Sequence, residues 1–257
     1  MRKLLTENGS KIFVDERAYG VQPGLLRDAK ELLDIYAPQA LVDGAVVRMF
    51  YASPGSVHEA RLSVARITGC RLGFSAEETS TGISVGGEEY IILRTDPSYS
   101  YEGIGGMLLH ELCHVAQKQP IMFGYGPETL ADIATCEYFA EKLALDIDPM
   151  ARAVVSDAGM RSDISEMAIG VPAKGQKISL SEVAGICGAW NAHLTHNYPH
   201  KEQLLPAFER VVAHRDKIYR RFLEPEDYAF FKRTKKALLA APLKRETVVE
   251  AFSKAGE

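Results

Sequence analysis

The chain has few cysteines and no long apolar run. Its four cysteines, Cys70, Cys113, Cys136 and Cys187, are widely spaced and form no CxxC pair. This excludes a dense disulfide scaffold and indicates buried thiols in a reducing compartment. No apolar stretch approaches the roughly 18 residues of a membrane span, and the N-terminus turns polar too early for a secretory signal. These absences predict synthesis in the cytosol, with leaderless export as the remaining alternative.

A charge excess of one sign is also lacking. The 257 residues include 30 Lys and Arg and 34 Asp and Glu, which gives a formal net charge of −4. A nucleic-acid-binding or membrane-binding surface would favour a basic excess. We therefore expect neither nucleic acid nor a membrane as a partner. The sequence contains no internal repeat or low-complexity tract, and it gives no indication of an oligomeric state.

The most informative motif in the chain is His110-Glu111-Leu112-Cys113-His114. Two histidines four residues apart on a helix lie one turn apart, about 5–6 Å along the axis, so both rings can reach one metal ion. Zinc accepts histidine nitrogen at about 2.0–2.1 Å. Glu111 points off this axis, where its carboxylate can take a proton from water that the metal activates. Cys113 should point away from the metal and pack in the interior.

A second acidic segment follows and begins like a helix. Pro127 is suited to the first turn, and Glu128 comes directly after it. Glu128 and Asp132 are four residues apart and share a helix face. We expect Glu128 to be the third metal ligand and Asp132 to accept the free N–H of a liganding histidine. Alternatively, Glu128 only complements the helix dipole and Asp132 is solvated. We expect Glu137 and Glu141, further along among Tyr138, Phe139 and Leu143, to flank a packed face, and they are only fallback ligands.

HExxH followed by ExxAD on a second helix resembles the glutamate-zincin metallopeptidases, the wider class that includes thermolysin. The short spacing and the run from Ala131 to Leu145 look most similar to the ImmA/IrrE-type minimal metallopeptidase domain. The resemblance covers about residues 45–147. It implies that His110, His114 and Glu128 are zinc ligands, that Glu111 is the general base, and that Asp132 orients a histidine ligand.

The distribution of apolar residues predicts an α+β fold. We expect a small antiparallel or mixed sheet packed on the HExxH helix and the glutamate-bearing helix, followed by an all-helical lobe. Residues 1–149 would form a zincin-like domain with an N-terminal helix, and residues 150–257 the helical lobe. The expected strands are 46–51, 82–85 and 90–93, the last two forming a hairpin around Gly86-Gly87. Beside the two motif helices, the expected helices are 25–36, 150–160, 181–193, 201–222, 225–239 and 245–253, with a loop at 172–176. The pattern of residues 56–68 is ambiguous, and a short helix is one alternative for them.

Two further features of the site follow from these elements. An edge strand of the small sheet could pair with an extended peptide and present it to the metal, unless residues 90–93 form an internal strand with no free edge. Tyr125, His193 and His196 are possible donors to the oxyanion that forms when water attacks a carbonyl. The alternative for the two histidines is a solvated helix end, where they would interact with the helix dipole.

The motifs together predict zinc-dependent hydrolysis of peptide bonds in a peptide or protein substrate. Metal-activated water would be the nucleophile, and Glu111 would accept its proton and pass it to the leaving amine. The alternative is a regulatory or protein-binding module that keeps the zincin fold with little or no peptidase activity. Glu111 speaks against a pure scaffold, because a structural zinc ion needs no base. A third possibility is hydrolysis of a non-peptide amide by the same residues.

Overall fold

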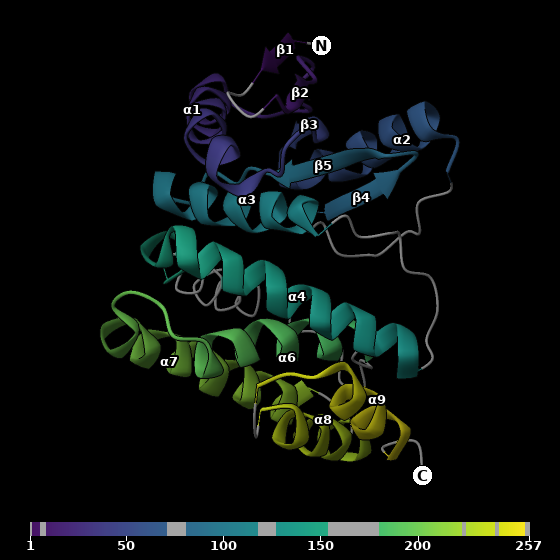
Figure 1. Ribbon diagram of the computed structural model, residues 1–257, viewed down its shortest axis with the longest axis vertical. Helices are drawn as coiled ribbons and strands as arrows, with labels where there is room; N and C mark the ends of the chain where they lie inside the picture. The colour runs from purple at the N-terminus through teal and green to yellow at the C-terminus, as the bar shows by residue number, and fades with distance from the viewer. Residues whose placement is uncertain are drawn as a thin grey trace. The chain divides into compact units, whose positions relative to one another are not determined.

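The computed structural model describes residues 2–5, 9–70, 81–117, 127–153, 180–222, 225–239 and 242–254. The chain divides into two compact units, residues 1–121 and 122–257, whose elements are labelled in Figure 1. The predicted α+β class is confirmed, because the first unit contains a sheet with helices and the described part of the second is helical. The boundary that we predicted after residue 149 lies inside the second unit.

The first unit is built on a mixed five-stranded sheet with the order β1-β2-β3-β5-β4. Strand β2 runs parallel to β3 and β3 runs parallel to β5, whereas β1 and β4 are antiparallel to their neighbours. β5 is therefore internal and β4 is an edge strand of this sheet. The strand bounds are β1 Arg2–Leu5, β2 Lys11–Val14, β3 Val46–Ala52, β4 Thr81–Val85 and β5 Glu88–Arg94.

The predicted hairpin is confirmed as β4 and β5. Its turn consists of Gly86 and Gly87, with φ angles of 62° and 81°. Positive φ at both central residues is the requirement of the tight turn whose twist matches the flanking strands, and glycine meets it without steric cost. The turn sets the register, in which Gly82 lies opposite Ile91. Residues directly opposite in a sheet point to the same face, so positions 82 and 91 share one.

Helices cover both faces of the sheet. Helix α2 (Val57–Thr68) packs with Phe50, Ala52, Tyr90 and Ile92 of β3 and β5 in one apolar cluster. Because side chains alternate along a strand, Met49, Tyr51, Ile91 and Leu93 point to the other face, and all four are fully buried. Helix α3 (Tyr101–Ala116) contacts β4 and β5, and helix α1 (Pro23–Ala40) packs against α3 (Figure 1).

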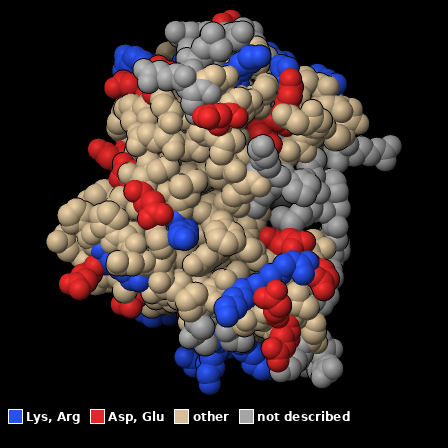
Figure 2. All heavy atoms as spheres, in the orientation of Figure 1, with Lys and Arg blue, Asp and Glu red and all other residues tan. Residues whose placement is uncertain are grey.

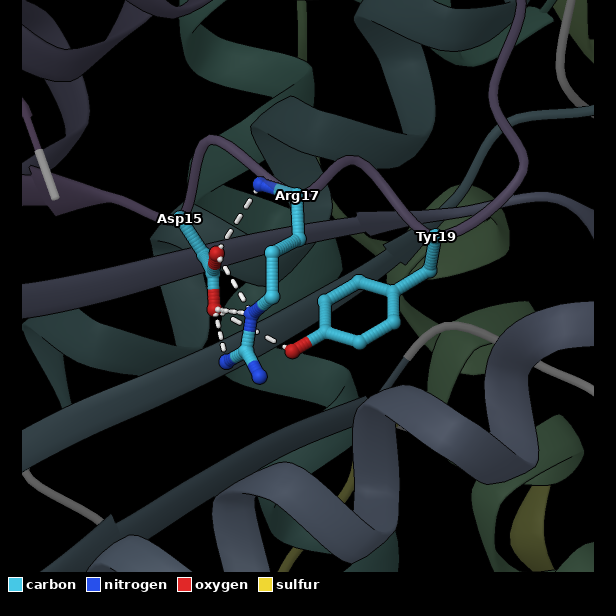
Figure 3. A network of polar contacts seen from close by, with 3 residues as sticks. All are labelled: Asp15, Arg17 and Tyr19. Atoms are coloured by element: carbon cyan, nitrogen blue, oxygen red, sulfur yellow. Dashed lines mark hydrogen bonds and ion pairs between the residues drawn. The ribbon is translucent and has the colours of Figure 1, made fainter.

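The segment after β2 is held by a network centred on Asp15 (Figure 3). Its buried carboxylate accepts hydrogen bonds from the backbone N–H and the guanidinium of Arg17, and from the hydroxyl of Tyr19 at 3.1 Å. Ala18, between these two partners, has a φ of 51°, a conformation that side chains other than glycine rarely adopt. The network thus offsets local backbone strain where the chain leaves the sheet.

The described part of the second unit consists of helices. Helix α4 (Pro127–Ile147) contacts α6 (Leu180–Thr195) and α9 (Arg245–Lys254), and α7 (Lys201–Phe222) and α8 (Pro225–Leu238) complete the described set. Its core includes Trp190, Phe208, Phe231 and Phe252. The helices that we predicted in residues 181–253 are confirmed within a few residues. Of the predicted helix 150–160, residues 150–153 are helical and the rest lies outside the described residues, as does the loop 172–176.

The surface carries both charges. Figure 2 shows acidic and basic side chains interspersed on the face in view, as the nearly balanced composition leads one to expect. None of the helices in the described ranges combines the length and the apolarity that a bilayer crossing requires.

Candidate metal centre

Helix α3 presents the HExxH motif from a rigid position. Its N-terminus is capped by Ser100, whose hydroxyl oxygen accepts a hydrogen bond from the N–H of Gly103 at 3.2 Å. This cap satisfies one of the backbone donors that every helix start leaves open. The apolar face is anchored in the interior by Leu108, Leu109 and Leu112, all fully buried. The predicted helix is confirmed.

The two histidines of the motif meet on that helix. The Nε2 atoms of His110 and His114 lie 3.1 Å apart, and their rings stand edge to face with centroids 4.7 Å apart. Two nitrogens bound to one zinc ion at 2.0–2.1 Å with a tetrahedral angle are separated by about 3.3 Å. The imidazole pair therefore has nearly the spacing that a shared metal ion needs. Both side chains are half-buried.

Glu111 lies between the histidines in sequence but is more deeply placed, with 9% of its surface exposed. Its Oε2 atom faces the edge strand β4, because a Cβ atom built on Gly82 would lie 3.4 Å from that oxygen. The carboxylate thus comes close to the main chain of β4. A carboxylate beside a histidine pair and next to an edge strand is well situated to accept a proton from a reacting group.

Cys113, in the same motif, is fully buried, and Cys136 and Cys187 are also buried. Burial raises the pKa of the Cys136 and Cys187 thiols to about 12, since a charged thiolate is disfavoured away from water. All four cysteines are free, and Cys70 is partly exposed. The expectation that most of them are packed thiols is confirmed.

The two acids of the ExxAD segment, Glu128 and Asp132, lie near the start of α4, and both form ion pairs with Arg245. Nη2 of Arg245 on α9 lies 2.5 Å from Oε2 of Glu128, and its Nε donates to Oδ1 of Asp132 at 2.7 Å. The hydrogen bonds to Asp132 and Glu128 raise the pKa of Arg245. The side chains of Glu128 and Asp132 are 66% and 43% exposed. The structure therefore brings these two predicted residues together, in an ion-pair cluster at the surface.

The second pair of acids on α4 lies in a different environment. Glu137 is half-buried, and its Cγ would lie 3.6 Å from a Cβ atom built on Gly185 of α6. Nine residues separate it from Glu128, which is two and a half helical turns. The two carboxylates therefore point to opposite sides of α4.

Glu141 takes part in a buried charged network. Its oxygens accept hydrogen bonds from Arg152 at 3.0 and 2.6 Å, and Nε2 of His193 lies 2.7 Å from its Oε1. The His193 ring also stacks on Phe208 with centroids 3.8 Å apart. Exposure of the Glu141 side chain is 1%. Glu141 and His193, predicted as a fallback ligand and a possible oxyanion donor, thus serve as partners of each other.

The remaining predicted oxyanion donors are distributed as follows. Nε2 of His196 lies 2.7 Å from Oδ1 of Asp146, at the C-terminal end of α4. Tyr125 lies outside the described residues. Sequence reasoning missed Gly82 and Arg245. A glycine inside a β-branched run is the signal that points to Gly82, whereas an arginine at a helix start gives no indication of its distant partners.

The chain matches no known protein-family model and no curated protein. We therefore base the proposed function on the residues of the chain itself.

Proposed function

We propose that the protein is a zinc-dependent peptidase in which His110 and His114 bind the metal ion and Glu111 is the general base. The observation that supports this best is the 3.1 Å separation of the two Nε2 atoms on one helix. This spacing fits a metal ion bound by both nitrogens, and it equally fits a hydrogen bond in which one imidazole donates and the other accepts. The buried glutamate between them fits the role of a base, which a purely structural zinc site does not need.

We further propose that a carboxylate of α4 is the third ligand and favour Glu137 for it. Together with His110 and His114, Glu137 would supply a donor set of two imidazole nitrogens and one carboxylate oxygen. Two histidines and one glutamate are a donor set that hydrolytic zinc sites use. Glu128, the ligand predicted from the sequence, shares its charge with Arg245 and would have to exchange this partner for the metal. It remains the competing candidate.

These residues would support the reaction as follows. A zinc ion held by His110 and His114 would polarise the substrate carbonyl and activate a water molecule. Glu111 would accept the proton from that water and pass it to the amine of the leaving half. Its position beside β4 places the proton acceptor next to an edge that an extended peptide can join as an additional strand. A substrate bound in this way would have its main chain aligned along β4.

The experiment that tests the proposal compares zinc content and peptide hydrolysis for the wild type and Glu111→Gln. We expect both proteins to bind one zinc ion per chain and only the wild type to cleave peptides, with a loss of turnover of about 10²–10⁴-fold in the variant. Glu102→Gln, an exposed residue on the same helix, is the matched control and should keep full activity. Zinc binding without hydrolysis in the wild type would favour the regulatory alternative instead.

The third ligand is identified by two matched variants on α4. If Glu137 is the ligand, Glu137→Gln weakens zinc binding strongly and Glu128→Gln leaves it nearly unchanged. If Glu128 is the ligand, the order is reversed. Competition with a fluorescent zinc chelator measures both affinities in the same assay.

A further inference from the structure

Glycine is an unusual residue for the middle of β4. The strand reads Thr81, Gly82, Ile83, Ser84, Val85, and glycine weakens a strand because it loses more conformational freedom than any other residue. The backbone conformation does not require a glycine here, since the φ angle of Gly82 is not positive, in contrast to that of Gly86. The usual conformational reason for a glycine therefore does not apply here.

Packing against the described residues does not require this glycine either. Among them, a Cβ atom at position 82 would have one neighbour within 4 Å, Oε2 of Glu111 at 3.4 Å, which is an ordinary van der Waals distance. The contrast is with Gly188, where a Cβ atom would lie 2.1 Å from the carbonyl oxygen of Ala134. The described residues would therefore accommodate alanine at position 82, and glycine leaves room there.

That room lies at the edge of the sheet and in front of the proposed base. Gly82 is exposed, β4 is an edge strand, and the face shared by positions 82 and 91 is the one opposite α2. A side chain at position 82 would extend from β4 towards the carboxylate of Glu111. Glycine inside a strand often marks a place where a ligand or another backbone approaches closely.

We propose that Gly82 is the position that admits the substrate main chain to Glu111, and that the size of residue 82 determines which peptides are cleaved. This inference rests on the proposed peptidase function. The occupant is an extended peptide segment, whose main chain passes over Gly82 on its way to the carboxylate. A larger side chain at position 82 narrows this passage without touching His110 or His114.

The test uses Gly82→Ala and Gly82→Val in the full chain, each also combined with Glu111→Gln. The substrate is the peptide that the wild type cleaves fastest from a quenched-fluorescent peptide library. Zinc content, melting temperature and kcat/KM are measured for the active proteins. Affinity for the same peptide is measured by calorimetry in the Glu111→Gln background, where the peptide is bound but not cleaved.

We expect zinc content to be unchanged in both variants, and the melting temperature to be unchanged or higher, because valine favours a strand more than glycine does. Gly82→Val should lower kcat/KM and weaken peptide binding by about tenfold or more, and Gly82→Ala by about threefold or less. Gly24→Val, the same substitution at an exposed glycine of α1 where a Cβ atom meets no described atom within 4 Å, is the control and should cleave like the wild type. Gly82→Ser replaces the valine variant if the latter does not fold.

The outcomes separate the inference from the function on which it rests. If the wild type binds zinc and needs Glu111 for cleavage, but Gly82→Val binds and cleaves as the wild type does, the role of Gly82 is overturned and the peptidase function stands. If the wild type neither binds zinc nor cleaves peptides, the proposed function fails, and the inference fails with it. A loss of activity equal in Gly82→Val and Gly24→Val would also overturn the inference, because it would not depend on the position of the new side chain.

Discussion

His193 on α6 is joined to Glu141 on α4 by a contact of 2.7 Å between Nε2 and Oε1, inside the second unit. Arg152 binds the same carboxylate through two nitrogens. The side chains of Glu141, Arg152 and His193 are 1%, 10% and 5% exposed. Buried charges are tolerated only when they are paired and hydrogen-bonded, so this network fixes α4 against its neighbours.

Removal of Glu141 should therefore destabilise the protein strongly. Glu141→Ala leaves the guanidinium of Arg152 buried without its carboxylate, and the expected loss in the free energy of unfolding is about 3–5 kcal/mol. Denaturant unfolding followed by circular dichroism measures it. The matched control on the same helix is Glu128→Ala, whose exposed ion pair with Arg245 should contribute less than about 1 kcal/mol. Equal losses for the two variants would contradict the account of the network.

The close approach of α4 and α6 depends on Gly188. A Cβ atom there would lie 2.1 Å from the carbonyl oxygen of Ala134, so Gly188→Ala forces the helices apart. We expect a loss of about 1–3 kcal/mol in stability, despite the higher helix propensity of alanine. Gly185→Ala, three residues earlier on the same helix, meets only an ordinary contact of 3.6 Å with Glu137. It should be neutral or stabilising by up to about 1 kcal/mol in the same measurement.

The network around Asp15 predicts a dependence of stability on pH (Figure 3). Burial by itself would raise the pKa of Asp15, but hydrogen bonds from Arg17 and Tyr19 outweigh it and lower the pKa below 3.8. A carboxylate whose pKa is lowered by folding stabilises the folded state above its unfolded pKa, and this contribution is lost as the pH falls through the folded pKa.

Asp15→Asn tests this directly. The variant should be less stable than the wild type by about 1–3 kcal/mol at pH 7, because it lacks the charge that Arg17 binds. The difference should shrink as the pH falls through the pKa of Asp15 in the folded protein, which lies below its ordinary value of 3.8. Thermal unfolding of both proteins between neutral and acidic pH gives the difference at each pH. A difference that is independent of pH would mean that the charge of Asp15 contributes nothing.

Substitution of Arg245, which pairs with Glu128, distinguishes between Glu128 and Glu137 as the third metal ligand. If Glu137 binds the metal, Arg245→Gln should change neither zinc affinity nor turnover and should lower stability by less than about 1 kcal/mol. If Glu128 binds the metal, the variant releases or misorients the ligand, and zinc affinity changes by about 10–100-fold. Zinc titration of Arg245→Gln beside the wild type decides between them.

Much of the secondary structure follows from the local sequence. The glycine pair 86–87 dictates the hairpin, Pro127 marks the start of α4, and the spacing of Leu108, Leu109 and Leu112 sets the buried face of α3. The meeting of His110 and His114 follows from helical geometry alone. These features are predictable because each depends on residues within a few turns of one another.

Contacts between segments that are distant in the sequence could not be predicted from local patterns. Strand β2 is four residues long, too short for an alternating pattern to reveal it, and its parallel pairing with β3 depends on the crossover through α1. Glu128 pairs with Arg245 of α9, Glu137 lies close to Gly185 of α6, and Glu141 binds Arg152. Spacing within α4 cannot rank these acids, since the ranking depends on burial and on long-range partners.

Zinc titration after removal of metal by a chelator measures whether the two imidazoles of α3 share a zinc ion. We expect one zinc ion per wild-type chain and loss of that binding in both His110→Gln and His114→Gln. All three proteins should keep the same helical content by circular dichroism. A wild-type chain that binds no zinc, or a His114→Gln variant that binds it as tightly as the wild type, would contradict the account.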